Sequence, residues 1–126
     1  MKHSTGKPTK RESEYIERCK TGPCVACYQW EGECNGVYGG WVQSPCDFNH
    51  CKSGNIRRGH MYGYGLCKWH HMRHPLDGRS HSEMGVMFGP SLMDGSRLFH
   101  LTYGSDDDLI ALQRELIGWE DELAAD

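Results

Sequence analysis

Long hydrophobic runs are absent from the sequence. No apolar stretch approaches the roughly 20 residues that a membrane-spanning helix requires, and the first residues, MKHSTGKPTKRESE, are polar throughout, unlike a secretory signal peptide. Internal repeats and low-complexity tracts are also missing. We therefore expect a single domain over residues 1–126 in the cytoplasm, a compartment that keeps thiols reduced.

Hydrophobic residues are scarce as well. They make up 37% of the 126 residues, and the mean hydropathy is −0.70, so the chain has enough apolar side chains for one modest core. What it has instead is 16 glycines and seven cysteines. In a reducing compartment, cysteines close to histidines indicate metal binding, and a bound metal would supply stability that a small core lacks.

The net charge is small, at −3, but it is unevenly distributed. Residues 105–126 hold eight of the 17 acidic residues and one of the 14 basic residues. The preceding part is therefore mildly basic, which suits an anionic ligand, although solvated faces also differ in charge by chance.

Local signals predict a small α+β protein. Thr9 and Glu12 form a capping box for a helix over residues 10–20, and Ser80 and Glu83 form another for a helix over 82–88. A strand is expected over 38–43, and a hairpin whose first strand ends at residue 50 and whose return strand lies within 60–67. A short helix should follow CKWHH, and a last helix should start at Ser105. The apolar face of this last helix is expected to pack against the core or, alternatively, against a partner protein, and it consists of Leu109, Leu112, Leu116, Trp119 and Leu123. Residues 1–8 are expected to be a loose arm, 9–74 the core of the domain and 75–126 its helical part.

Two cysteine-containing pairs share one spacing. Cys24 and Cys27 form a C-x-x-C pair, and Cys67 and His70 form a C-x-x-H pair about 40 residues later. Zinc is usually held by four such ligands, taken as two close pairs from distant parts of the chain. We therefore predict a structural zinc site. The other four cysteines are expected to be small core residues: Cys19, Cys34, Cys46 and Cys51. Because Cys46 and Cys51 lie on either side of His50, a second zinc site there stays open as an alternative.

His71, which directly follows the Cys67 and His70 pair, is not needed as a zinc ligand. If a helix begins at this point, His70 and His71 point about 100° apart, so that His71 is available for a second, catalytic metal. His50 and His71 would then lie on one side of a small cleft, with basic residues in the loop between them: Lys52, Arg57 and Arg58. A neutral histidine that takes a proton from water, a divalent metal and basic side chains are the parts that phosphodiester hydrolysis requires.

These residues carry a family resemblance. The NH pair followed by LCKWHH resembles the HNH (His-Me finger) endonucleases, which have a ββα-metal core. For this chain we therefore expect an α+β fold with a small zinc-stapled core of this type, flanking helices and long irregular loops. More closely, GPCVAC, RRGHMYGYGLCKWHH, FGPS and GSRLFHLTYGSDDDLIALQRELI are similar to the phage and prophage RecA-dependent nucleases of the Ref (recombination enhancement) family, over roughly residues 1–118. The resemblance implies RecA-assisted cleavage of DNA in the host cytoplasm with Mg²⁺ or Mn²⁺ in the active site.

The resemblance also implies roles for single residues. It makes His50 the general base, and it makes His71 and Asn49 the ligands of the catalytic metal. Asn49 stands where the family usually has histidine, and its neutral amide oxygen is a weaker ligand. The middle Asn of HNH has no clean counterpart, because the superfamily spacing leads to Tyr62; His60 is the substitute for this orienting role, with phosphate contact or hairpin packing as the alternative. Three of the remaining histidines are expected on the surface: His3, His74 and His81. For His100, a packing role and a functional role both stay open.

Three functions are compatible with this pattern. The first is a metal-dependent DNA endonuclease. The second is a zinc-stabilised nucleic-acid-binding module, a degenerate nuclease in which Asn49 marks a lost site; such a module has no use for both His50 and His71. The third is a redox sensor, which requires a thiol of low pKa at Cys46 or Cys51.

Overall fold

The computed structural model describes residues 6–34, 42–53 and 56–120. In these ranges the chain forms a small α+β fold of six α-helices, a short 3-10 helix and two antiparallel two-stranded sheets. None of the helices in the described ranges combines the length and the apolar character needed to cross a bilayer.

The two sheets are successive parts of one hairpin. Strand β1 (Asp47–His50) pairs with β4 (Gly63–Leu66), and β2 (Lys52–Ser53) pairs with β3 (Ile56–Arg57). The hairpin was expected, with its first strand ending at His50 and its return strand within 60–67. The expected strand over 38–43 falls mostly outside the described residues, and residues 42 and 43 are not in a strand.

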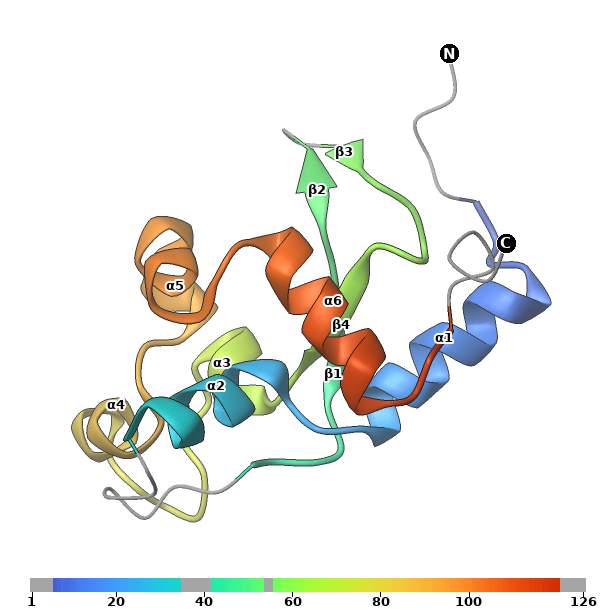
Figure 1. Ribbon diagram of the computed structural model, residues 1–126. Helices are drawn as coiled ribbons and strands as arrows, with labels where there is room; N and C mark the ends of the chain where they lie inside the picture. Colours follow the sequence, from blue (N-terminus) through green and yellow to red (C-terminus); the bar gives the residue numbers. More distant parts are fainter. Residues whose placement is uncertain (1–5, 35–41, 54–55, 121–126) are drawn as a thin grey trace.

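Strand β4 lies at the centre of the molecule (Figure 1), where it contacts β1 and four helices: α1 (Lys10–Thr21), α2 (Val25–Cys34), α3 (Lys68–Met72) and α6 (Asp106–Leu116). Its two glycines allow this close packing. A Cβ atom on Gly65 would lie 2.5 Å from the carbonyl oxygen of Cys19, and one on Gly63 would lie 2.5 Å from that of Asn49. Tyr64 and Leu66, between and after these glycines, are fully buried.

Helix α3 (Lys68–Met72) follows β4 after a single residue, Cys67, so that the hairpin and α3 form a compact strand–strand–helix unit. It ends because Arg73 takes a left-handed conformation (φ 62°) and Pro75 follows. The following described residues form α4 (His81–Phe88), the 3-10 helix η1 (Leu92–Asp94), α5 (Ser96–Tyr103) and α6. Helices were expected at the positions of α4 and α6, whereas η1 and α5 were not.

The predicted helix starts are confirmed at atomic detail. The capping boxes of Thr9 with Glu12 and of Ser80 with Glu83 both form, and Ser105 makes a third with Asp108. On α6, Leu109 is buried, and Leu112 and Leu116 pack against the core, as the core interpretation of this face requires. Leu123 lies outside the described residues.

Candidate metal centre and active site

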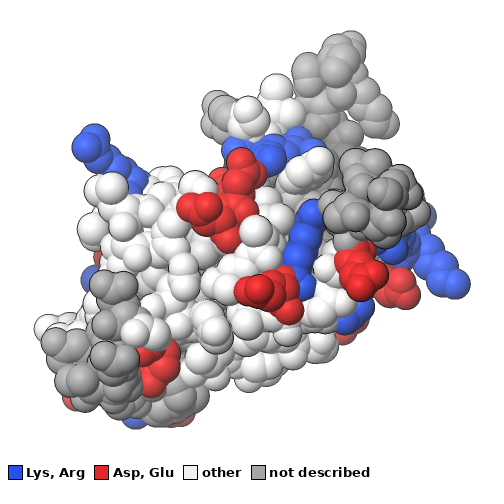
Figure 2. All heavy atoms as spheres, viewed as in Figure 1, with Lys and Arg blue, Asp and Glu red and all other residues white. Residues whose placement is uncertain are grey.

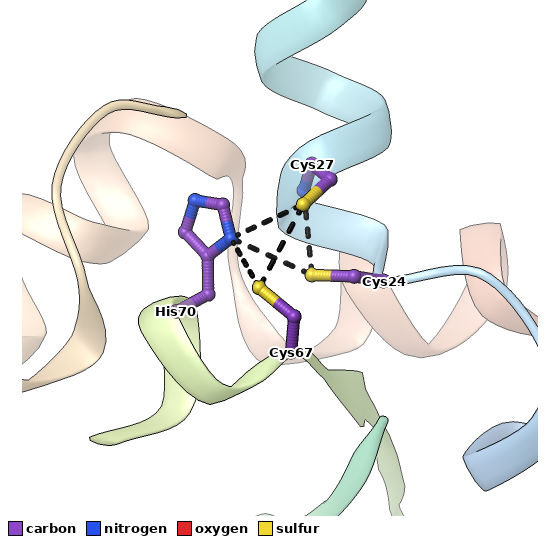
Figure 3. A group of neighbouring side chains, drawn as sticks. All are labelled: Cys24, Cys27, Cys67 and His70. Atoms are coloured by element: carbon purple, nitrogen blue, oxygen red, sulfur yellow. Dashed lines mark hydrogen bonds between the residues drawn. The ribbon is translucent and has the colours of Figure 1, made fainter. Parts of the chain in front are cut away.

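The four predicted zinc ligands come together in the core. Cys24 immediately precedes α2 and Cys27 lies in its first turn, whereas Cys67 joins β4 to α3 and His70 lies on α3. Their Sγ atoms and the Nδ1 atom of His70 all lie within 4.8 Å of one another, and the four residues are at most 2% exposed. In Figure 3 all four side chains point toward a common centre.

The distances within the cluster fit a tetrahedral zinc ion. Zinc–sulfur bonds of about 2.3 Å and zinc–nitrogen bonds of about 2.0–2.1 Å place two sulfurs about 3.8 Å apart and a sulfur and a nitrogen about 3.5 Å apart. The Sγ atoms of Cys27 and Cys67 are 3.8 Å apart. Nδ1 of His70 lies 3.5 Å from the Sγ atoms of Cys24 and Cys27, and 3.3 Å from that of Cys67. The donor set and its spacing therefore fit zinc.

Electrostatics also favour a cation at this centre. Burial tends to lower the pKa of His70, but the neighbouring thiols of Cys24 and Cys67 outweigh it and raise that pKa to about 10. The pKa of Cys24 is lowered, against the effect of its burial, by hydrogen bonds from neighbouring thiols and by the charge of His70. Thiolates in such a place require a compensating positive charge, which zinc supplies.

The C-terminal helices hold His70 in the orientation for metal binding. Its Nε2–H donates to the carbonyl oxygen of Phe88 at 2.8 Å, so in the neutral ring that binds a metal the lone pair is on Nδ1, the nitrogen nearest the three sulfurs. The hydroxyl of Tyr103 lies 3.1 Å from the same Nε2 and itself donates to the carbonyl oxygens of Phe88 and Pro90. These contacts were not predicted, because nothing in the local sequence connects α3 with α4 and α5.

The other described cysteines lie outside this cluster. Cys46 donates to the carbonyl oxygen of Gly22, and its pKa is raised by the hydrogen bond with Cys24 and by burial. Burial, with help from Asp106, raises the pKa of Cys51 to about 12. Within the described residues only one group has the geometry of a metal site, and neither Cys46 nor Cys51 belongs to it. The raised pKa of each of these two thiols is opposite to the low thiol pKa that a redox sensor at Cys46 or Cys51 requires.

His50 and His60 form a hydrogen-bonded pair. Nε2 of His50 lies 3.3 Å from Nδ1 of His60, and Nε2 of His60 lies 2.8 Å from the carbonyl oxygen of Gly6. A carbonyl only accepts, so Nε2 of His60 carries the proton and its Nδ1 accepts from His50 when both rings are neutral. The lone pair of His50 is then on Nδ1. Burial, the charge of Arg57 and the neighbouring His60 lower the pKa of His50, which favours this neutral form.

His71 lies on α3 and is paired with a carboxylate that the sequence did not single out. Its Nδ1 lies 2.9 Å from Oδ2 of Asp47, and Nζ of Lys68 lies 2.7 Å from Oδ1 of the same residue. The pKa of Asp47 is lowered because these two hydrogen bonds outweigh the effect of burial. Strand alternation could have indicated Asp47, since it lies two residues before Asn49 and thus on the same face of β1.

Asn49 lies opposite Tyr64 in the register of β1 and β4. A polar pocket of about 330 Å³ opens here, and it also contains residues from α5 and α6; its lining is Asn49, His50, Cys51, Lys52, Tyr64, Leu92, Ser96, His100 and Asp106. Asp106 accepts from the Tyr64 hydroxyl at 2.7 Å and pairs with Nε2 of His100 at 3.4 Å. His100, whose role the sequence left open, thus lines the pocket that contains Asn49 and His50.

The basic residues of the loop differ in their surroundings. Lys52 and Arg57 are exposed and face each other across the strand pair β2–β3. Arg58 instead donates to Asp107 at 2.8 Å and stacks on Tyr62 at 4.7 Å. On the face shown in Figure 2, acidic and basic side chains lie in small adjacent groups. Two of the three predicted DNA-contacting side chains are therefore open to a ligand, and the third is already paired.

Comparison with known proteins identifies one family. The model described as "Recombination enhancement, RecA-dependent nuclease" matches residues 8–118, a range that includes the Cys₃His cluster and all the histidines from His50 to His100. No curated protein gives a significant match.

Proposed function

The chain belongs to the family of recombination-enhancement, RecA-dependent nucleases, and we propose that it is a metal-dependent DNA endonuclease of the HNH (His-Me finger) type. Family membership gives the general class, a nuclease and hence a hydrolase that acts on DNA in recombination. The HNH type is supported by the strand–strand–helix unit of β1, β4 and α3, which carries His50 on a strand and His71 on the helix.

The observation that carries the proposal is the chain of contacts from Gly6 through His60 to His50. It leaves the lone pair on Nδ1 of His50, a residue that lines a polar pocket together with Asn49 and Lys52. A neutral histidine held in this way can accept the proton of the attacking water, the role of a general base. His60 does not touch the substrate in this scheme; it orients His50.

Asn49 and His71 are the proposed ligands of a catalytic divalent ion. Their amide oxygen and imidazole nitrogen are donor types that Mg²⁺ and Mn²⁺ accept, so the donor set fits. When bound, the ion supplies Lewis-acid stabilisation of the charge that develops at the scissile phosphate and the leaving oxygen. The Cys₃His site has a different part: its zinc joins α2 to α3 and thereby fixes the position of His71.

Binding of DNA is assigned to Lys52, Arg57 and Arg58. Contacts from such side chains go to phosphates, so they position the strand without reading its sequence. The family name supports RecA as a partner, and we propose that DNA in a RecA filament is a substrate.

The proposal is tested by incubating the zinc-loaded protein with single-stranded and duplex DNA, with Mg²⁺ or Mn²⁺, with and without RecA filaments. We expect cleavage that depends on the added divalent ion and disappears with EDTA, while the protein keeps its zinc. The His50→Ala variant should bind the same DNA with unchanged affinity but not cut it. Metal-independent cleavage, or equal cleavage by His50→Ala, would contradict the proposal.

A second candidate function is a zinc-stabilised nucleic-acid-binding module without catalysis. The observation in its favour is Asn49 itself, where related nucleases usually have a stronger ligand. It predicts DNA binding under all the conditions above and no cleavage under any of them. The same assay therefore separates the two functions.

A further inference from the structure

We infer that Asp47 is a positioning residue for His71, which fixes the tautomer and the direction of its ring so that Nε2 is presented to a divalent cation. The inference rests on the proposed function, because that function makes His71 a metal ligand. It concerns a residue that neither the family match nor the spacing of the motifs assigns.

The fold places Asp47 where it meets α3. Asp47 begins β1 and pairs in register with Leu66, the last residue of β4, and α3 starts two residues later at Lys68. Lys68 and His71 are three positions apart on the helix and therefore lie on the same side of it. Both reach Asp47, each at a different oxygen of the carboxylate, at 2.7 Å and 2.9 Å.

The contact determines which nitrogen of His71 can bind a metal. A carboxylate accepts hydrogen bonds, so the proton of a neutral His71 is on Nδ1, and the lone pair is on Nε2. Within the described residues Nε2 has no hydrogen-bond partner of its own. A histidine whose second nitrogen donates to a carboxylate is the usual arrangement at metal sites, where it fixes the ring and raises its basicity as a ligand.

A purely structural role for this contact would have little effect. Asp47 and His71 are both about a quarter exposed, at 25% and 26% of their side chains, and Lys68 is 63% exposed. Ion pairs with this degree of exposure typically contribute between zero and about 1 kcal/mol to stability. Loss of an outer carboxylate partner, in contrast, typically weakens metal binding about 10- to 100-fold. The two roles therefore predict different sizes of effect on metal binding.

The first test measures Mn²⁺ binding to the zinc-loaded protein by electron paramagnetic resonance, without DNA and without any activity assay. We expect Asp47→Asn to raise the Kd for Mn²⁺ by about 10- to 100-fold. Asp94→Asn is the matched control, because Asp94 also pairs with a basic side chain near α3, Arg73 at 2.7 Å, but has no contact with His71. This control should leave the Kd unchanged.

His71→Ala separates the inference from the proposed function. If His71→Ala abolishes binding while Asp47→Asn binds as the wild type does, Asp47 does not position His71, and the proposed role of His71 stands. If His71→Ala binds Mn²⁺ as tightly as the wild type, or if the wild type itself shows no saturable binding, the assignment of His71 as a ligand fails and the inference fails with it.

A second measurement needs no variant that might fold poorly. Long-range ¹H–¹⁵N NMR spectra of the wild-type protein above pH 7.5 distinguish the two neutral tautomers of each histidine. We expect His71 to be protonated mainly at Nδ1, and a spectrum with the proton mainly on Nε2 would overturn the inference.

Discussion

Loss of the Cys₃His centre should destabilise the whole fold, and the size of the effect follows from the structure. The perturbation is Cys67→Ala, which removes one sulfur from a cluster whose members are all within 4.8 Å of one another. Cys27 and Cys67 are 40 residues apart in the sequence, so a bound zinc ion closes a loop of this length.

Loop entropy gives the magnitude. A cross-link that closes a loop of 40 residues lowers the entropy of the unfolded chain by an amount worth about 4 kcal/mol at 25 °C. A chain of 126 residues typically has a free energy of unfolding of about 6–19 kcal/mol. The cross-link is therefore a large share of the total, and the buried thiols that remain in the variant would lose the positive charge that compensates them.

The assay combines urea denaturation, followed by circular dichroism, with elemental analysis of zinc. We expect about one zinc per chain in the wild type, no zinc in Cys67→Ala, and a free energy of unfolding lower by about 4 kcal/mol or more. The matched control is Cys19→Ala, since Cys19 is also fully buried but lies outside the cluster. It should keep its zinc and lose about 1 kcal/mol.

Two results would refute this reasoning. One is a wild-type protein that is folded and contains no zinc. The other is a zinc-free Cys67→Ala whose free energy of unfolding lies within about 1 kcal/mol of that of Cys19→Ala. Either would mean that packing alone holds α2 against α3.

Three further predictions concern the proposed active site. His50→Ala should lower the cleavage rate by about 10²- to 10⁴-fold with an unchanged Kd for DNA, measured on one duplex substrate; equal rates would place the base elsewhere. Arg57→Gln should reduce the slope of log K against log salt by about 0.9 on duplex DNA, and Arg58→Gln should reduce it less because its guanidinium already donates to Asp107; equal reductions would contradict the structural difference between them. Asn49→Asp adds a negatively charged ligand at nearly unchanged size, so it should lower the Mg²⁺ or Mn²⁺ concentration for half-maximal cleavage, whereas superimposable metal titrations would remove Asn49 from the site.

The features that could be predicted from the sequence are those that depend on near neighbours in the chain. A capping box joins two residues three positions apart, and both predicted boxes form. The zinc ligands are two local pairs, and the only long-range step, bringing the pairs together, follows from the coordination number of zinc. The hairpin from β1 to β4 could be predicted for a comparable reason, because two strands that lie close together in the sequence can pair with each other directly.

Helix α2 was missed, although it carries Cys27. Its sequence, VACYQWEGEC, has no basic residue near its end and includes a glycine, so its helix signals are weak. It is helical because its first turn is held by the cluster: the backbone N–H of Cys27 donates to Sγ of Cys24, and Val25 and Ala26 are fully buried. Helix α5 was missed for a related reason. It has no side-chain cap at its start, and it is held in place by the packing of its buried residues, Phe99 and Tyr103.

The partners of the site histidines could not be predicted, because they come from distant parts of the chain. His60 contacts Gly6 across 54 residues, His50 contacts His60 across ten, and His71 contacts Asp47 across 24. Each of these partners determines a tautomer, and tautomers decide which nitrogen can act as a base or bind a metal. The sequence thus singled out these histidines as candidates, while the tautomer of each depends on contacts that the fold creates.

The C-terminal helices are connected to the proposed chemistry at the hairpin through α3. His70 and His71 are adjacent on α3, and the first is held by the zinc cluster and by the carbonyl of Phe88 at the end of α4. Tyr103, at the end of α5, fixes that carbonyl and the next segment through two hydrogen bonds. A five-residue helix such as α3 is too short to be stable by itself, so its orientation must come from these contacts. The Cys₃His cluster, α4 and α5 together therefore hold the helix that carries His71, and in our proposal Asp47 determines which nitrogen of His71 is available to a metal ion.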